Sequence, residues 1–157
     1  MRRTVLCLAL LLLPVGPAFA AADHWVAEMQ EDEGGPVMVA SVTAAAVGDV
    51  TPELFMMCAG SEGLNLRYIS TADNVAEGSE ADFSFENENS KLTEHMKLEE
   101  MDGAFAAYFK PSDPMVAFLQ TGADVLISES SGNYPAQTFT LTGSSKAIGK
   151  LLKDCKE

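Results

Sequence analysis

The sequence predicts a mainly β domain. We expect an antiparallel β-sandwich or a barrel-like sheet, with a short helix before the last two strands and an amphipathic helix at the C-terminus. Two observations lead to this prediction. From about residue 24 onward, short segments with apolar residues at every second position are separated by turn sequences at roughly 8–12-residue intervals. At the end of the chain, the apolar period changes from that of a strand to that of a helix.

About nine strands are expected between the turn signals. In a typical one, Leu64, Leu66 and Tyr68 alternate with Asn65 and Arg67, as in a half-buried strand. The run Gly60-Ser61-Glu62-Gly63 has the composition of a hairpin connection. The expected strands, in chain order, are His24–Met29, Pro36–Val47, Leu54–Ala59, Leu64–Tyr68, Ala81–Glu86, Leu92–Glu99, Ala104–Phe109, Asp124–Ser130 and Tyr134–Gly143.

Two helices are expected in the last third of the chain. The first is Pro114–Gln120, with Asp113 as its N-cap and proline at its first position. The second is Ser144–Cys155, which begins after Gly143 with Ser144 as a suitable N-cap. Its apolar residues fall on one face, which is therefore the buried one. They are Ala147, Ile148, Leu151, Leu152 and Cys155.

The N-terminus has the pattern of a secretory signal peptide. Arg2 and Arg3 precede the apolar run Val5–Pro14, and Ala18-Phe19-Ala20 is a small-x-small cleavage site. An uncleaved membrane anchor is the alternative, but the apolar run is shorter than a membrane span needs. We therefore assign residues 1–21 to the signal peptide and 22–157 to one β-rich domain. The mature protein is expected in the periplasm or outside the cell, without a membrane span.

The chain is strongly acidic, with a formal net charge of −13. Loss of residues 1–21, which carry Arg2 and Arg3 and no acid, would bring this to −15. A surface of this charge repels nucleic acid and attracts basic partners or divalent cations. The simpler alternative is an acidic surface that only keeps an exported protein soluble.

Two cysteines, Cys58 and Cys155, remain after signal cleavage. In an oxidising compartment such a pair favours one disulfide, and two buried thiols are the alternative. The chain has no C-x-x-C sequence, so a redox-active pair is not expected.

No catalytic, cofactor or metal site is predicted, and we expect the protein not to be an enzyme. A nucleophilic mechanism needs a base close to a serine or cysteine, and the histidines are His24, next to the cleavage site, and His95, on the polar face of a strand. Ser144 is explained by its position at a helix start. The acidic side chains lack the spacing of a calcium loop, and the methionines have the strand spacing of core residues.

Several segments resemble a known family in their order along the chain. They are Trp25-Val26, the segment Leu54–Gly60 in which a strand ends in a cysteine before a hairpin, Phe83-Ser84-Phe85, and the final Pro135–Gly143 strand followed by a helix that ends in Cys155. Together they resemble the periplasmic VasI-like (TagO-like) proteins associated with type VI secretion. The final strand and helix are also similar to the invasion-associated locus B family. The resemblance implies a small disulfide-linked β domain in the periplasm of a Gram-negative bacterium, without catalytic residues to carry over.

Two functions from different classes remain open. The first is a non-catalytic module that binds another envelope protein or serves a secretion system, possible because a β fold offers sheet edges for strand addition. The second is a small acidic inhibitor of a basic enzyme such as lysozyme, which the negative charge would steer toward its target. The predicted partner surface combines the Gln30–Gly35 turn with the Asn87–Ser90 turn. Its acidic residues are Glu31, Asp32, Glu33, Glu86 and Glu88.

Overall fold

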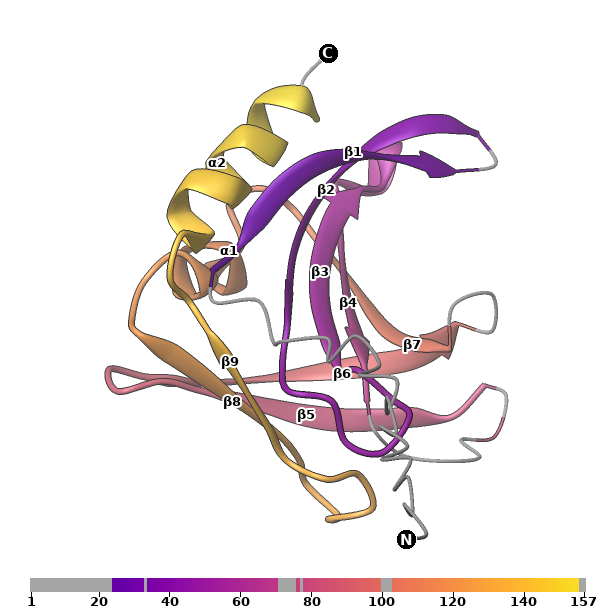
Figure 1. Ribbon diagram of the computed structural model, residues 1–157, viewed down its shortest axis with the longest axis vertical. Helices are drawn as coiled ribbons and strands as arrows, with labels where there is room; N and C mark the ends of the chain where they lie inside the picture. Colours follow the sequence, from indigo (N-terminus) through magenta and orange to yellow (C-terminus); the bar gives the residue numbers. More distant parts are fainter. Residues whose placement is uncertain (1–23, 33, 71–75, 77, 100–102, 156–157) are drawn as a thin grey trace, which may run out of the picture.

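A computed structural model describes residues 24–32, 34–70, 76, 78–99 and 103–155. Within them the chain forms nine strands, two α-helices and one 3₁₀ turn (Figure 1). The elements in chain order are β1 (Val26–Asp32), β2 (Gly35–Thr43), β3 (Glu53–Cys58), η1 (Gly60–Glu62), β4 (Leu64–Ile69), β5 (Glu80–Glu86), β6 (Lys91–Glu99), β7 (Ala104–Phe109), α1 (Pro114–Leu119), β8 (Asp124–Glu129), β9 (Gln137–Thr140) and α2 (Ser144–Asp154).

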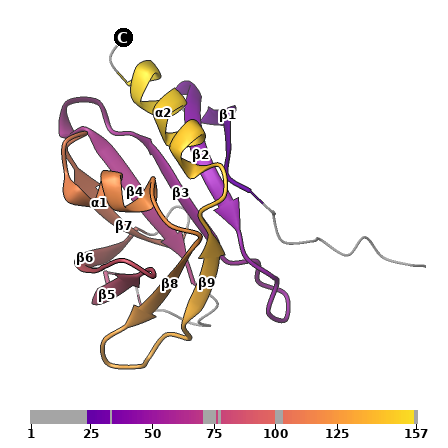
Figure 2. The same cartoon turned by 90° about the vertical axis from the view of Figure 1, so that its left-hand side faces the viewer.

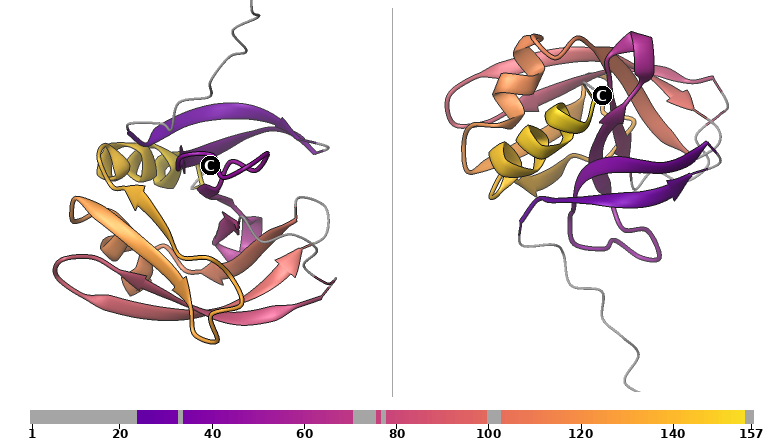
Figure 3. Two further views of the ribbon diagram at one scale, coloured as in Figure 1. Left: turned by 60° about the horizontal axis from the view of Figure 1, so that its bottom comes forward. Right: turned by 90° about the horizontal axis from the view of Figure 1, so that it is seen from above.

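The nine strands form one antiparallel sheet in the order β1-β2-β3-β4-β7-β6-β5-β8-β9. The prediction of a mainly β fold is confirmed, and of the two predicted architectures the barrel-like sheet is the one observed. A sandwich would need a second sheet, whereas here every neighbouring pair belongs to the same one. Figures 1 and 3 show that the sheet curls around a common interior, and in Figure 1 β3 and β4 cross β5 and β6 at a steep angle.

The core fills the inside of this curled sheet. Its largest fully buried side chains include Tyr68, Phe83, Phe105 and Phe139, which come from strands along most of the sheet. Their rings meet edge to face, with centroids 4.8–6.0 Å apart, an arrangement that adds to the stabilisation from burial. The expected period-2 pattern therefore identifies the core-facing side of the strands.

The two ends of the sheet meet at Trp25. Its backbone N–H donates to the carbonyl of Thr142 at 2.8 Å, and its indole Nε1–H donates to the carbonyl of Thr140 at 2.8 Å. These bonds link the start of β1 to the end of β9, although no ladder joins the two strands within the described residues. The helix α2 packs against β1, β2 and β3 next to this junction (Figure 2).

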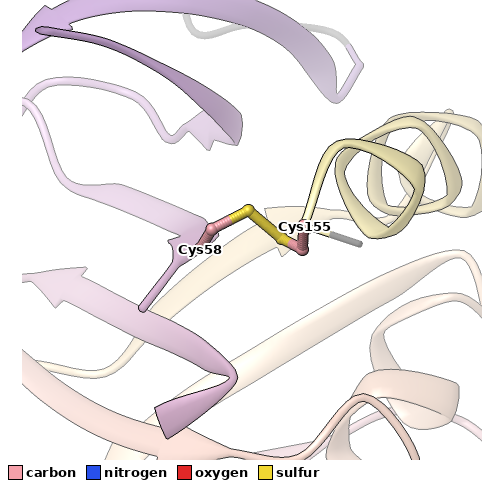
Figure 4. Close-up of a disulfide and its surroundings, with 2 residues drawn as sticks. All are labelled: Cys58 and Cys155. Carbon is pink, nitrogen blue, oxygen red and sulfur yellow. A yellow bond between two sulfur atoms is a disulfide. The ribbon is translucent and has the colours of Figure 1, made fainter. Parts of the chain in front are cut away.

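A disulfide ties α2 to the sheet. The sulfurs of Cys58, at the end of β3, and Cys155, at the end of α2, are bonded, and their Cα atoms are 5.5 Å apart (Figure 4). The apolar face of α2 is buried as expected through Ala147, Ile148 and Leu151. The prediction of a disulfide over two buried thiols is confirmed.

The structure corrects some predicted boundaries. β1 begins at Val26 and runs to Asp32, so it includes part of the acidic segment that was predicted to be a turn, and β2 ends at Thr43 rather than Val47. The expected N-cap Asp113 accepts a bond from the backbone N–H of Met115 at 2.9 Å, which confirms that cap. Ser144 is not an N-cap but the first helical residue of α2, because the left-handed Gly143 already occupies the cap position.

The predicted signal peptide, residues 1–21, lies outside the described residues. Within the described part of the chain, neither helix is long and apolar enough to cross a membrane.

Candidate functional site

The outer face of β2, β3 and β4 is hollowed into a groove of about 350 Å³. Its side chains point away from the core, as the strand register shows, because Ser41, Phe55 and Arg67 lie opposite one another across the three strands. We call this hollow the outer groove. It is lined by Gln30, Glu31, Asp32, Val37, Val39, Glu53, Phe55, Met57, Arg67 and Ile69.

The floor of the outer groove is apolar. Val39 is only 3% exposed even though it faces away from the core, and Phe55 and Met57 beside it are half-buried. Val39 belongs to β2, and Phe55 and Met57 belong to β3, whose sequence Leu54-Phe55-Met56-Met57 is apolar at every position rather than at every second one. Such a strand presents an apolar surface on both faces, and the outward one contributes to the groove.

Arg67 supplies the positive charge of the groove. It is 8% exposed, and its guanidinium lies 5.8 Å from the centre of the Phe55 ring and 2.9 Å from the carboxylate of Glu99. Glu99 also accepts a 2.6 Å hydrogen bond from the hydroxyl of Tyr108. This hydrogen bond raises the pKa of Tyr108 to about 12, and burial and the negative charge of Glu99 add to the increase. The arginine is thus held in place by a carboxylate and an aromatic ring.

Two other polar groups characterise this face. Burial raises the pKa of Glu53 in the groove wall, and a hydrogen bond with Ser41 partly offsets the increase. Asn65, 5% exposed, lies between Met57 and Tyr108 in the register. Its Oδ1 is buried and has no hydrogen-bond partner within the described residues. The carboxylates that line the groove, Glu31, Asp32 and Glu53, suit a ligand that offers hydrogen-bond donors or a positive charge better than an anion.

The β1–β2 hairpin borders the groove and leaves a sheet edge beside it. β1 pairs with β2 along its whole length, from Val26 opposite Ser41 to Asp32 opposite Gly35. No strand pairs with the other side of β1 within the residues that the structure describes. Gln30 and Asp32 lie both on this edge strand and in the lining of the groove, so the two features form one continuous surface.

The structure places the predicted partner residues in two separate regions. Glu31 and Asp32 lie at the end of the β1–β2 hairpin and line the outer groove, while Glu33 lies outside the described residues. Glu86 and Glu88 belong to the β5–β6 hairpin, which Figures 1 and 3 show on the opposite side of the molecule. The two acidic turns therefore do not form a joint surface.

The acidic residues of the β5–β6 hairpin have local partners. Glu86 lies 3.4 Å from the Nζ of Lys91. Glu88 accepts a 3.4 Å bond from the backbone N–H of Ala123, and its carboxylate lies over Gly122. These contacts engage the two side chains within the protein. Because Glu31 and Asp32 line the outer groove, the β1–β2 half of the predicted surface is the better candidate.

His95 lies between two carboxylates on the exposed surface of β6. Its Nδ1 is 2.8 Å from Asp82 and its Nε2 is 3.4 Å from Glu80, and its side chain is 63% exposed. The hydrogen bond with Asp82, followed by that with Glu80, raises the pKa of His95. Within the described structure, the hydrogen-bond partners of the ring are these two carboxylates, and no serine or cysteine is bonded to it.

Metal coordination has no evident location in the described part of the chain. No group of three or more His, Cys, Asp or Glu side chains there is arranged to hold a metal ion. In particular, His95 with its two carboxylates does not form such a group.

Sequence reasoning did not identify the outer groove. The alternation of Asn65 and Arg67 with core residues predicts only a half-buried strand, and no local pattern marks Glu53 or Phe55 as site residues. The uninterrupted apolar run in β3 was the signal that could have indicated a second apolar face. In comparisons with known proteins the chain matches no family model, no curated protein and no solved structure, so the outer groove and the β1 edge are the features on which a functional proposal rests.

Proposed function

We propose that the protein is an exported, non-catalytic module that binds another protein of the bacterial envelope through the outer groove. The observation that carries this proposal is the apolar floor of the groove on a sheet face that points away from the core. A groove with an apolar floor and a few polar groups is the usual form of a binding site. Its acidic border, Glu31, Asp32 and Glu53, selects a partner segment with basic side chains.

The cellular setting is proposed from the sequence. A secretory signal and a disulfide suit the periplasm or the exterior of the cell. Kinship with the VasI-like (TagO-like) proteins of type VI secretion is proposed on the same grounds. It is supported by the position of Cys58 at the end of a strand and of Cys155 at the end of the closing helix. A gene located beside type VI secretion genes would support a role in that apparatus. If the gene lies outside the type VI secretion gene clusters in related genomes, that result would count against this role.

A pull-down with matched variants tests the binding function. Val37→Asp places a carboxylate in the groove at a half-buried position, and Thr93→Asp introduces the same carboxylate on the exposed face of β6. The wild type and Thr93→Asp should retain the same envelope protein from the producing cell, and Val37→Asp should lose it. Recovery of the same protein by all three would show that the groove is not the binding surface, and repeated recovery of none would oppose a binding function.

A second candidate function is inhibition of a basic enzyme such as lysozyme. It is favoured by the β1–β2 hairpin, because the segment from His24 to Thr43 contains four acids and no lysine or arginine. An acidic hairpin at a sheet edge is suited to enter the active-site cleft of a cationic enzyme. Inhibition of lysozyme at low ionic strength that weakens with added salt would support this function, and full lysozyme activity under the same conditions would exclude it for that enzyme.

A further inference from the structure

The ladder between β1 and β2 fixes which backbone groups of β1 point outward. In an antiparallel pair, alternate residues turn their N–H and C=O groups toward the partner strand, and the residues between them turn away. The backbone N–H of Ala44 donates to the carbonyl of Pro52, which is the next pair in the register between β2 and β3. The backbone groups of even-numbered residues of β2 therefore point toward β3, and those of odd-numbered residues point toward β1. The register then leaves the backbone groups of Ala27, Met29 and Glu31 pointing away from the sheet.

Two independent contacts agree with this assignment. The backbone N–H of Trp25, two residues before Ala27, points outward and donates to Thr142. The carbonyl of Ala27 also points outward and accepts a 2.9 Å bond from the Nζ of Lys150 on α2. The first part of the β1 edge is thus covered by β9 and α2. Within the described residues, no backbone or side-chain hydrogen bond covers the outward groups of Met29 and Glu31.

We propose that the open half of β1 binds an extended segment of the partner protein as an added strand, in which basic and apolar residues alternate. This inference rests on the proposed binding function and specifies its mode and the chemistry of the partner. The added strand would pair with the N–H and C=O groups of Met29 and Glu31. Exposed edge strands commonly bind peptides in this way, with backbone bonds giving affinity and alternate side chains giving selectivity.

The two faces of β1 determine the alternation. Glu28 and Asp32 lie on the outer-groove face, and both are exposed. Met29 lies on the other face and is 51% exposed, which is large for an apolar side chain at an edge. Because side chains of neighbouring strands lie on the same face when their residues are paired, basic residues would face Glu28 and Asp32, and an apolar residue would cover Met29.

The test uses a capped seven-residue peptide of alternating lysine and valine, with NMR of the intact mature protein. At a peptide concentration about ten times Kd, solvent exchange of the amide hydrogens of Met29 and Glu31 should slow roughly tenfold, in proportion to the unbound fraction. The amides of Glu28 and Gln30 already bond to β2 and should not change. This alternate-residue protection distinguishes an added strand from a peptide that only rests on the groove.

Three control peptides make the result specific. A peptide with the lysines and valines in separate blocks should bind at least about tenfold more weakly, as should one in which glutamate replaces lysine. The alternating peptide with methylated backbone nitrogens on the side that faces β1 keeps its charge and should lose the protection. Equal binding of all four peptides, or binding without protection of Met29 and Glu31, overturns the proposal, and so does absence of binding by the alternating peptide.

Variants of the protein provide the second arm. Met29→Pro removes an outward N–H but no ladder bond, and proline is tolerated on edge strands. In the Met29→Pro variant, amide hydrogens of Glu28 and Gln30 that are still protected from solvent exchange would confirm that β1 is formed. Glu28→Lys should weaken the alternating peptide about fivefold at low salt, whereas Glu86→Lys, with the same change in charge on the opposite hairpin, should leave its Kd unchanged. Equal effects of the two charge reversals would contradict the proposal.

The pull-down separates this inference from the binding function itself. If Met29→Pro loses the envelope protein that Thr93→Asp retains, strand addition is supported. If Met29→Pro retains a protein that Val37→Asp loses, the groove binds the partner without an added strand, and only the inference fails. If the wild type retains no protein, the proposed function fails as well.

Discussion

Removal of the Cys58–Cys155 disulfide should destabilise the protein without unfolding it at room temperature. The bond joins residues 97 positions apart. On the chain-entropy account, closing a loop of this length stabilises the fold by up to about 4.7 kcal/mol, and measured losses for native disulfides are about 2–5 kcal/mol. The native fold should persist in the double variant Cys58→Ser/Cys155→Ser because α2 remains docked by the buried residues Ala147, Ile148 and Leu151.

The magnitude can be measured by urea and thermal unfolding of the mature protein, followed by circular dichroism and by the fluorescence of Trp25, the single tryptophan. A loss of about 4 kcal/mol in a domain of this size corresponds to a decrease in Tm of roughly 10–15 °C. The urea m-value should increase, because an unlinked unfolded chain exposes more surface.

Reduced wild type is the matched control for this experiment. Its unfolding curve should coincide with that of the double variant, and the double variant should not respond to reductant. A loss below about 1 kcal/mol, or a wild-type curve unchanged by a reductant that demonstrably opens the bond, would refute the assignment of this stabilisation to loop closure.

Gly149→Ala should stabilise the protein by about 0.5–1 kcal/mol in urea unfolding, because it replaces a helical glycine where an added Cβ has open space. Gly63→Ala should instead cost at least about 2 kcal/mol, because φ there is 101° and the new Cβ would overlap a backbone carbonyl of β7. Similar effects of the two substitutions on stability would contradict the structure. Trp25→Phe should cost about 1 kcal/mol in the same assay by removing the indole bond to β9, and no loss would mean that this bond does not hold the sheet ends together. The pKa of His95 in an NMR titration should lie above its ordinary value of 6.5, and Asp82→Asn should lower it. Because the pKa of His95 is raised in the folded state, the stability from this group is fully present below the unfolded pKa and is lost as pH rises through the folded pKa. His95→Gln should therefore flatten the dependence of the unfolding free energy on pH in that range. An unchanged dependence would contradict the raised pKa of His95.

The sequence predicted the fold well where one physical rule decided the outcome. Phe83 and Phe85 are at every second position, and both are in the core, because only one face of that strand meets the interior. The disulfide was predictable because two cysteines lie outside the predicted signal peptide, and an oxidising compartment favours their pairing. The N-cap at Asp113 was predictable from the aspartate–proline pair that opens α1.

The rest depended on tertiary geometry that local patterns do not contain. Whether the strands form one curled sheet or two packed sheets is decided by pairings such as β4 with β7, whose residues are far apart in the sequence. In the outer groove, Arg67 of β4 forms an ion pair with Glu99 of β6. The periodicity of apolar residues along one strand does not show which other strand lies close to it. The acidic turns were expected to act together, but the β1–β2 and β5–β6 hairpins lie on opposite sides because the curl of the sheet separates them.

Site-specific photo-crosslinking in the producing cell tests most directly that recognition occurs at the β1 edge and the outer groove. A photoreactive benzoylphenylalanine placed at Gln30, which lies on both features, should give one defined adduct with an envelope protein. The same residue at Thr93, on the exposed face of β6, should give none, and mass spectrometry should locate the Gln30 crosslink in a segment of alternating basic and apolar residues. An adduct from Thr93 with none from Gln30 would place recognition elsewhere on the molecule.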